Sequence, residues 1–206
     1  PSSALDNQIE KGKLLANKSN VDEYDENIDP LGTMVGKRGM KSVMNYIDES
    51  NSKNPRKYNF QYKPEIKRKY GSIFHSSELF KYSAKISKIC ETIKKSKGII
   101  LIYSQYIDGG VVPMALALEE MGFTRFGTSE YTKPLFEKAP SEKIDALTMK
   151  PKSEVNEGFK PAKYVMITGD RAYSPQNSLD IKEVTNANNK NGENVKVVLI
   201  SKAGSE

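Results

Sequence analysis

The chain contains very few of the residues that build disulfides and metal sites: one cysteine and one histidine among 206 residues. A single cysteine, Cys90, excludes an internal disulfide and a cysteine-based zinc site. It falls on an apolar helical stripe, which predicts a buried structural thiol. His75 has no second histidine or cysteine with which to share a metal ion, and we expect it to lie in a loop. We therefore predict no metal-binding residue in this chain.

Long apolar runs are also missing, and only 37% of the residues are hydrophobic. This fraction is low for a fully packed globule, so we expect some of the chain to lie outside the core. No run is long enough to span a bilayer, and the first residues do not resemble a signal peptide. We expect an intracellular, soluble protein that does not contact a membrane.

Positive charge is distributed unevenly along the chain. Residues 1–98 carry a net charge of +7, whereas residues 99–206 carry −1. Residues 37–97 alone hold 16 basic and 5 acidic side chains, interleaved with the aromatic residues Tyr58, Phe60, Tyr62 and Tyr70. Such a segment can hold a phosphate backbone and stack bases. The alternative is a solvated lysine-rich surface, which the excess of lysine over arginine favours.

Residues 1–70 carry no motif that we can place, and we expect a polar and basic N-terminal arm or linker that is irregular and partly disordered. The stretch from Pro30 to Met40 looks like a phosphate-binding loop at first. Its glycines Gly32 and Gly36 are too close together, Arg38 stands where a hydroxyl should bind magnesium, and no apolar strand precedes it. We therefore reject nucleotide binding there. We expect a short helix over residues 40–48 and a loop over residues 49–64.

The best-defined pattern lies between residues 98 and 123. Residues 99–103 form an apolar run on both faces, which is typical of a central parallel strand. A polar turn over residues 104–110 follows, and then a helix from about Val112 with Gly122 as its C-cap. In α/β sheets, ligands bind in such turns at the carboxyl ends of strands.

Two later runs repeat the strand pattern. Residues 163–168 lead into Gly169 and Asp170, and residues 195–200 lead into residues 201–206. We expect an amphipathic helix over residues 77–95, capped by Ser76 or Ser77, and another from residue 175 or 176 to about 187, capped by Ser174. Residues 127–163 are expected to form a long irregular insertion. The sequence therefore predicts an α/β fold, with helices flanking a parallel sheet and three loops along one edge.

The stretches SKGIILIYSQYIDGGVVPMALALEEMGFTRFG, YVMITGD and VKVVLISKAGSE occur in this order and spacing. Together they resemble the second RecA-like domain of superfamily II helicases. The likeness is to the DEAD/SNF2-like helicases of large nucleocytoplasmic DNA viruses, which are related to the poxvirus early transcription factor small subunit. It covers residues 79–206. The resemblance implies that residues 71–206 form a RecA-like helicase domain.

The resemblance also implies roles for the loops. The implied nucleic-acid contacts come from motif IV and from the end of the second strand: Ser104, Gln105, Thr168, Gly169 and Asp170. The residues implied at the interdomain nucleotide cleft belong to the start of motif V: Gly204, Ser205 and Glu206. Exposed amides and hydroxyls at Ser104, Thr168, Gly204 and Ser205 can donate to phosphates. We predict no catalytic residue among them.

The resemblance implies ATP and Mg²⁺ as cofactors of a longer parent protein. The N-terminal RecA-like domain of that parent would supply the phosphate-binding lysine and the acidic magnesium pair, and the rest of motif V and motif VI would follow Glu206. Phosphoryl transfer depends on such groups, so we expect a truncated domain that binds no cofactor and lacks ATPase activity by itself. Further implied partners are DNA or RNA and viral transcription machinery, in virions or cytoplasmic viral factories.

Two other functions stay open. The chain can be a non-catalytic interaction module that docks nucleic acid or a protein of the transcription machinery. It can also be a Rossmann-like hydrolase in which Asp108 and Asp170 are paired carboxylates at adjacent strand ends. Against the hydrolase, the sequence has no glycine fingerprint and no nucleophile-base pair.

Overall fold

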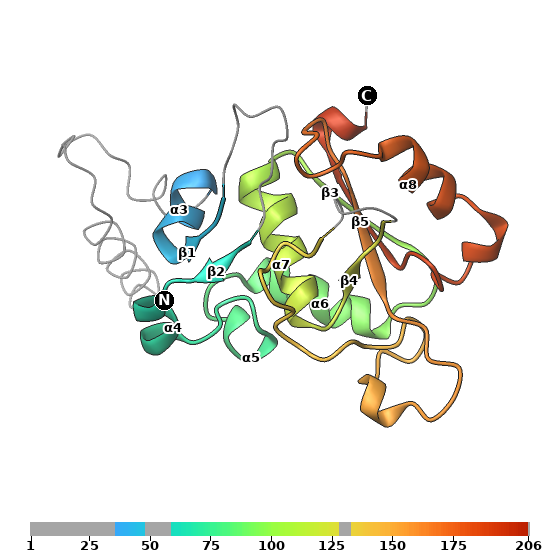
Figure 1. Cartoon of the computed structure of the whole chain (residues 1–206), viewed down its shortest axis with the longest axis horizontal. Coiled ribbons are helices and arrows are strands. Elements are labelled where there is room, and N and C mark those ends of the chain that lie inside the picture. Colours follow the sequence, from blue (N-terminus) through green and yellow to red (C-terminus); the bar gives the residue numbers. More distant parts are fainter. Residues whose placement is uncertain (1–35, 48–58, 128–132, 206) are drawn as a thin grey trace.

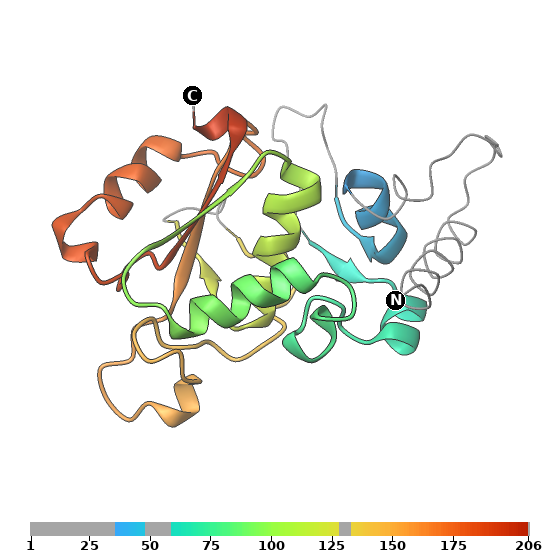
Figure 2. The same ribbon diagram turned by 180° about the vertical axis from the view of Figure 1, so that it is seen from behind.

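A four-stranded parallel sheet organises the molecule (Figures 1 and 2). The computed structural model describes residues 36–47, 59–127 and 133–205. The sheet strands are β3 (Ile100–Ser104), β4 (Thr124–Arg125), β5 (Lys163–Ile167) and β6 (Val197–Ser201). They lie in the order β3-β6-β5-β4, and every neighbouring pair is parallel. The predicted α/β class, with helices flanking a parallel sheet, is confirmed.

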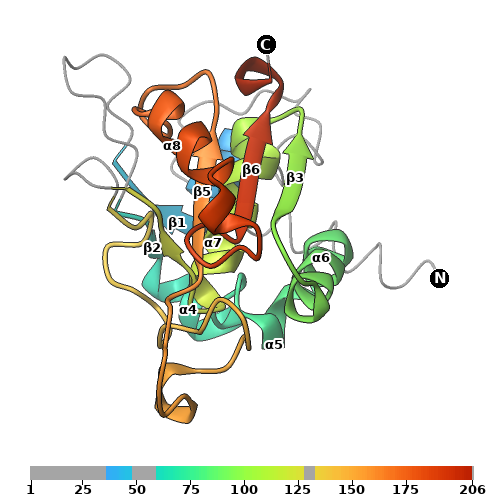
Figure 3. The same ribbon diagram turned by 90° about the vertical axis from the view of Figure 1, so that its right-hand side faces the viewer.

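β3 lies at an edge of this sheet, so the prediction of a central strand is wrong (Figure 3). Its side chains alternate between two environments. Ile100 and Ile102 pack against the core, whereas Leu101 is 66% exposed and Tyr103 is 56% exposed. An apolar run thus has only one of its faces covered within the described part of the chain.

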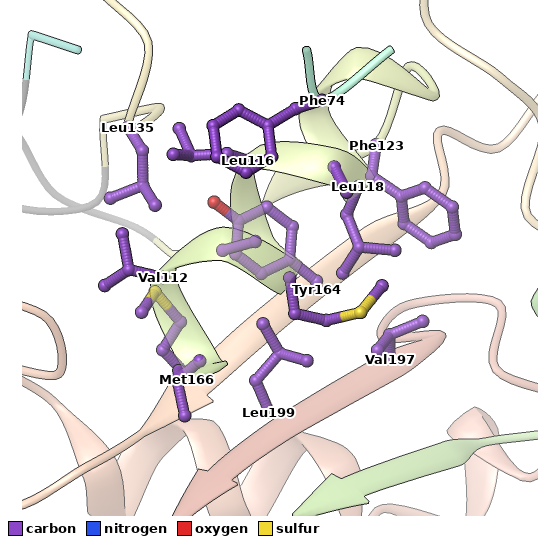
Figure 4. Close-up of a cluster of buried hydrophobic side chains, with 14 of the residues drawn as sticks. Phe74, Val112, Leu116, Leu118, Phe123, Leu135, Tyr164, Met166, Val197 and Leu199 are labelled. Carbon is purple, nitrogen blue, oxygen red and sulfur yellow. The ribbon is translucent and has the colours of Figure 1, made fainter. Parts of the chain in front are cut away.

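The covered face of the sheet packs against α6 (Ala84–Lys95) and α7 (Val112–Glu120). Every residue of α7 except Pro113 is buried, and Figure 4 shows its side chains meeting those of β5 and β6. The labelled members of this cluster from α7, β5 and β6 are Val112, Leu116, Leu118, Tyr164, Met166, Val197 and Leu199. Cys90 of α6 is buried in the same core, and burial raises the pKa of its thiol to about 11. The prediction of a buried structural thiol is confirmed.

The opposite face of the sheet is covered by α8 (Asn177–Val184), which packs on β5. A smaller apolar cluster forms there from Val165, Ile167, Val195 and Val198. The helix is shorter than predicted, and a single 3-10 turn, η4 (Ala187–Asn189), follows it. Ser174 does not cap α8, contrary to prediction, because its hydroxyl donates to the carbonyl oxygen of Thr168 at 2.7 Å.

The predicted helix over residues 77–95 is divided into α5 (Ser76–Leu79) and α6. His75 caps α5, since its ring nitrogen accepts from the amide of Ser77. Ser83 has extended backbone and caps α6 by accepting from the amide of Ile86 at 3.2 Å. The prediction of one continuous helix capped by Ser76 or Ser77 is therefore wrong, because a serine inside it serves as a second N-cap.

The described part of the N-terminal segment packs on the same core. It forms α3 (Gly36–Val43), a two-stranded antiparallel ribbon of β1 (Met44–Asn45) and β2 (Gln61–Tyr62), and α4 (Pro64–Tyr70). The helix expected over residues 40–48 thus begins earlier and ends earlier. Met40, Met44 and Phe60 are buried in the main core cluster. The division of the chain at residue 70 stays a prediction, and residues 1–35 lie outside the described residues.

Two of the aromatic residues predicted to stack bases have structural roles instead. Phe60 is 1% exposed and stacks on Tyr46 with ring centroids 4.5 Å apart. The hydroxyl of Tyr62 donates to Glu120 at 2.7 Å and accepts from the amide of Phe74. Tyr58 lies outside the described residues. Phe60 and Tyr62 hold the N-terminal segment to the core, and the prediction that they stack on bases is wrong.

The connection between β4 and β5 is long and irregular, as predicted. Its described part contains a short 3-10 helix, η3 (Lys152–Glu154), and isolated bridges that join Ile144 to Pro151 and Asp145 to Pro161. Glu119 of α7 anchors the start of this connection, because its carboxylate accepts the amides of Leu135 and Phe136. None of the described helices is both long and apolar enough to cross a membrane.

Candidate functional site

The carboxyl ends of β3, β6 and β5 lie side by side, as the sequence predicted. Ser104 pairs with Ser201, and Ile167 pairs with Ile200, so Thr168 follows directly beside Ser201. We call residues 104–111, 168–174 and 201–205 the strand-end edge. β6 is the last of these strands in sequence and the middle one in space. The predicted contacts after β5 and β6 are therefore direct neighbours.

Ser104 shapes the turn that follows β3. Its hydroxyl donates to the carbonyl oxygen of Tyr106 at 3.0 Å and accepts the amide of Tyr106 at 3.3 Å. The chain then enters a single π-helical turn, η1 (Ile107–Val111), which continues into α7. A β carbon at position 110 would collide with the Ser104 side chain, so this close approach requires Gly110. Gln105 is exposed at the tip of the turn.

Thr168 is 1% exposed, so the predicted exposure of its hydroxyl is wrong. Its amide donates to the Ser174 hydroxyl at 3.0 Å, and its own hydroxyl accepts the amide of Asp170 at 3.2 Å. A carboxylate oxygen of Asp170 in turn accepts the amide of Ala172. These bonds hold the loop after β5 in shape. Its surface is presented by the exposed Gly169 and the half-buried Asp170.

Two glycines allow the loops after β5 and β6 to touch. A β carbon at position 169 would lie 2.7 Å from that of Ala203. One at position 204 would collide with the carbonyl oxygen of Ile167. Larger residues would push the loops apart. Gly204 therefore packs on the end of β5, while Ser205 is exposed and its hydroxyl donates to the carbonyl oxygen of Lys202. Glu206 lies outside the described residues.

Ser201 carries an unused hydrogen-bonding group at the centre of this edge. The residue is 1% exposed, and its hydroxyl has no hydrogen-bond partner in the described part of the chain. It lies between Ser104 and Thr168, whose hydroxyls shape their own loops. Buried polar groups nearly always find a partner, so the unpaired hydroxyl of Ser201 is an exception.

Exposed cations lie on the strand-end edge and beside it. Sequence reasoning did not predict them as contacts. Arg171 follows Asp170, and Lys202 follows Ser201 in a 3-10 turn, η5 (Lys202–Gly204); both are exposed. Helix α3 also packs on η1, and its first turn carries Lys37 and Arg38. Sequence reasoning could have found Arg171 and Lys202, because each directly follows a residue at the end of a strand.

The contact between α3 and η1 involves the stretch that we rejected as a phosphate-binding loop. A β carbon on Gly109 would lie 3.6 Å from the backbone nitrogen of Gly36. This packing places the basic first turn of α3 beside the turn after β3. The half-buried Asp108 belongs to the same turn and opposes the positive charge.

The topology separates the two carboxylates of the hydrolase hypothesis. Asp108 follows β3 and Asp170 follows β5, with β6 between those strands. The prediction of adjacent strand ends is wrong. Among residues 36–47, 59–127 and 133–205, no three His, Cys, Asp or Glu side chains gather in a group that could hold a metal ion. The described residues do not fit a magnesium site, and the proposals below assign no residue of this chain to Mg²⁺ or ATP.

Two buried carboxylates of the helices that flank the sheet have raised pKa values. Burial raises the pKa of Glu119, against the opposing effect of its bonds to Phe136, Tyr164 and Leu135. Burial also raises the pKa of Asp180 in α8 to about 6, and the nearby charge of Arg125 partly offsets this.

Comparison with protein-family models, curated proteins and solved structures found no match for this chain.

Proposed function

We propose that this chain is the second RecA-like domain of an ATP-dependent nucleic-acid helicase or translocase, and that its strand-end edge holds the nucleic-acid backbone. One observation carries the proposal. The three loops that resemble helicase motifs lie along one edge of a parallel sheet, and exposed cations flank them. That edge is where α/β sheets bind ligands.

The chemistry of the edge suits a phosphate backbone. Phosphates are bound by Arg and Lys, by hydroxyls and by backbone amides, which together fix the register of a protein on nucleic acid. The cations at or beside the edge are Lys37, Arg38, Arg171 and Lys202, against two described carboxylates, Asp108 and Asp170. The loops after β5 and β6 add exposed backbone at Gly169 and Ser205.

In this proposal the parent protein hydrolyses ATP between this domain and an N-terminal RecA-like domain. Closure of the cleft between the two domains then moves the protein along DNA or RNA. The viral resemblance suggests a role in virions or cytoplasmic viral factories, beside the transcription machinery. These parts rest on the resemblance of residues 79–206 to superfamily II helicases.

The test is a salt titration of binding to a labelled oligonucleotide, followed by fluorescence anisotropy. The double variant Arg171→Ala/Lys202→Ala removes two cations from the strand-end edge. Each lost phosphate contact should lower the slope of log affinity against log salt by about 1. The matched control is Lys95→Ala at the exposed end of α6, just before the amino end of β3. Equal slopes for the native chain and the double variant would contradict the proposal.

A non-catalytic interaction module is the second candidate, and exposed apolar side chains on β3 and α8 favour it. Leu101 of β3 is 66% exposed, and Leu179 and Ile181 of α8 are 55% and 46% exposed. Exposed apolar patches commonly mark protein-binding surfaces. This candidate predicts a protein partner whose binding does not weaken as salt rises, in contrast to nucleic-acid binding.

A further inference from the structure

Two exposed tyrosines flank the predicted backbone contacts Ser104 and Gln105. Tyr103 is 56% exposed and Tyr106 is 66% exposed. Tyr103 ends the incompletely covered face of β3, where it pairs with Ile200 of β6. Neither ring is needed to fill the core. Their exposure contrasts with Phe60, which belongs to the basic segment and is buried.

The backbone of Tyr106 is held firmly although its ring is exposed. Its amide donates to the Ser104 hydroxyl, and its carbonyl oxygen accepts both that hydroxyl and the amide of Val111. Gly109 packs behind it, where an added β carbon would lie 3.7 Å from that of Tyr106. A ring on a fixed backbone loses little conformational freedom when a ligand stacks on it.

Cations lie on both sides of this turn. Gly36 packs on Gly109, which brings the basic first turn of α3 to it. On the other side, Lys202 directly follows Ser201, the partner of Ser104 in the sheet. Aromatic rings beside a positively charged backbone site are the recurring arrangement of proteins that bind single-stranded nucleic acid.

We propose that unpaired bases stack on Tyr106 and Tyr103, so that the ligand of the strand-end edge is single-stranded nucleic acid. This inference rests on the proposed function and adds to it the form of the ligand. In a duplex the bases already stack on one another and pair, so their faces are not available to these rings. Contacts to phosphates alone would not distinguish single strands from duplexes, because both carry a charged backbone.

The experiment compares three ligands of equal length: oligothymidylate, the same backbone without bases, and an oligothymidylate in duplex with its complement. Binding of oligothymidylate is also measured in high salt. Tyr106→Ala removes the ring, Tyr106→Phe keeps it, and Phe80→Ala removes a ring of similar exposure from the segment between α5 and α6. Circular dichroism checks that each variant keeps the native fold.

We expect Tyr106→Ala to bind oligothymidylate about 5- to 150-fold more weakly, which is the range for losing one stacked base. Its affinity for the abasic backbone should not change, and Tyr106→Phe and Phe80→Ala should match the native chain. Tyr103→Ala should show a loss of the same kind. The native chain should prefer the single strand to the duplex.

The inference is overturned if Tyr106→Ala weakens binding to both backbones equally, or if the native chain binds duplex and single strand alike. The inference also fails if the abasic oligomer binds as tightly as oligothymidylate. That result would leave the proposed binding of phosphates by the strand-end edge standing. A native chain that binds none of the ligands at low salt would overturn the proposed function together with this inference. A loss with Tyr106→Phe equal to that with Tyr106→Ala would assign the effect to the Tyr106 hydroxyl instead of the ring and reject stacking.

Discussion

The two faces of the sheet are covered unequally. On one face, α6 and α7 bury side chains from β3, β5 and β6 in the main core cluster. On the other face, α8 covers β5 and leaves Leu101 and Tyr103 of β3 exposed. Because side chains alternate along a strand, neighbouring residues of β3 belong to surfaces with different roles.

This difference separates stability from binding within a single strand. Ile100 and Ile102 contribute to the core, and Leu101 between them does not. Beyond the strand, Ser104 supports the turn and Tyr106 projects from it. We expect substitutions on the covered face to change the free energy of unfolding, and substitutions on the exposed side to change binding.

The largest expected effect is on the covered face. Leu199→Ala removes a fully buried side chain of β6 and should lower the free energy of unfolding by about 2–5 kcal/mol, through lost burial and the cavity left behind. Ile200→Ala is the matched control, since it is the next residue, faces α8 and is only partly buried. Urea unfolding followed by circular dichroism measures both. Equal losses would mean that the two faces contribute alike.

A pH-dependent effect of intermediate size is expected from α8. The pKa of Asp180 rises from 3.8 to about 6 in the folded chain, chiefly through burial. Because the folded-state value is the higher one, the protein loses stability as pH rises through this range. Asp180→Asn cannot ionise, so it should gain stability over the native chain between pH 4 and pH 7, by about 1–3 kcal/mol at pH 7.

Urea titrations of Asp180→Asn and the native chain at several pH values measure this difference. The matched control is Glu157→Gln, which changes an exposed carboxylate in the connection between β4 and β5. A stability difference for Asp180→Asn that stays constant with pH would show that Asp180 does not titrate in this range.

The smallest expected effect is on the exposed face. Leu101→Ala should change the free energy of unfolding by no more than about 0.5 kcal/mol, because the side chain is already 66% in solvent. Ile102→Ala, one residue along the same strand, should cost more, since Ile102 packs on the main core. Urea unfolding of both variants tests the comparison. A larger loss for Leu101→Ala would imply that this face is covered in solution.

The strands were predictable because their signal is local. The runs that became β3, β5 and β6 are apolar and rich in β-branched residues, and each ends in small or polar residues. Parallel strands place their carboxyl ends at one edge, so the shared position of Ser104, Thr168 and Ser201 followed as well.

Other predictions failed where a local pattern had two meanings. The serine at position 83 suited the polar face of a long helix, yet it caps a new one. The aromatic residues Phe60 and Tyr62 suited base stacking beside lysines, yet they anchor the N-terminal segment to the core. For Tyr62 the deciding partner is distant in sequence, because its hydroxyl bonds Glu120 of α7.

By itself the sequence determined which segments form strands, that the sheet is parallel, and that the three loops share an edge. Only the tertiary structure decided that β6 lies between β3 and β5, that β3 is an edge strand, and that α3 packs beside the turn after β3. Strand formation depends on residues close together in the chain. Strand order depends on which pairings of distant segments bury the most apolar surface together, and no short stretch of sequence records that.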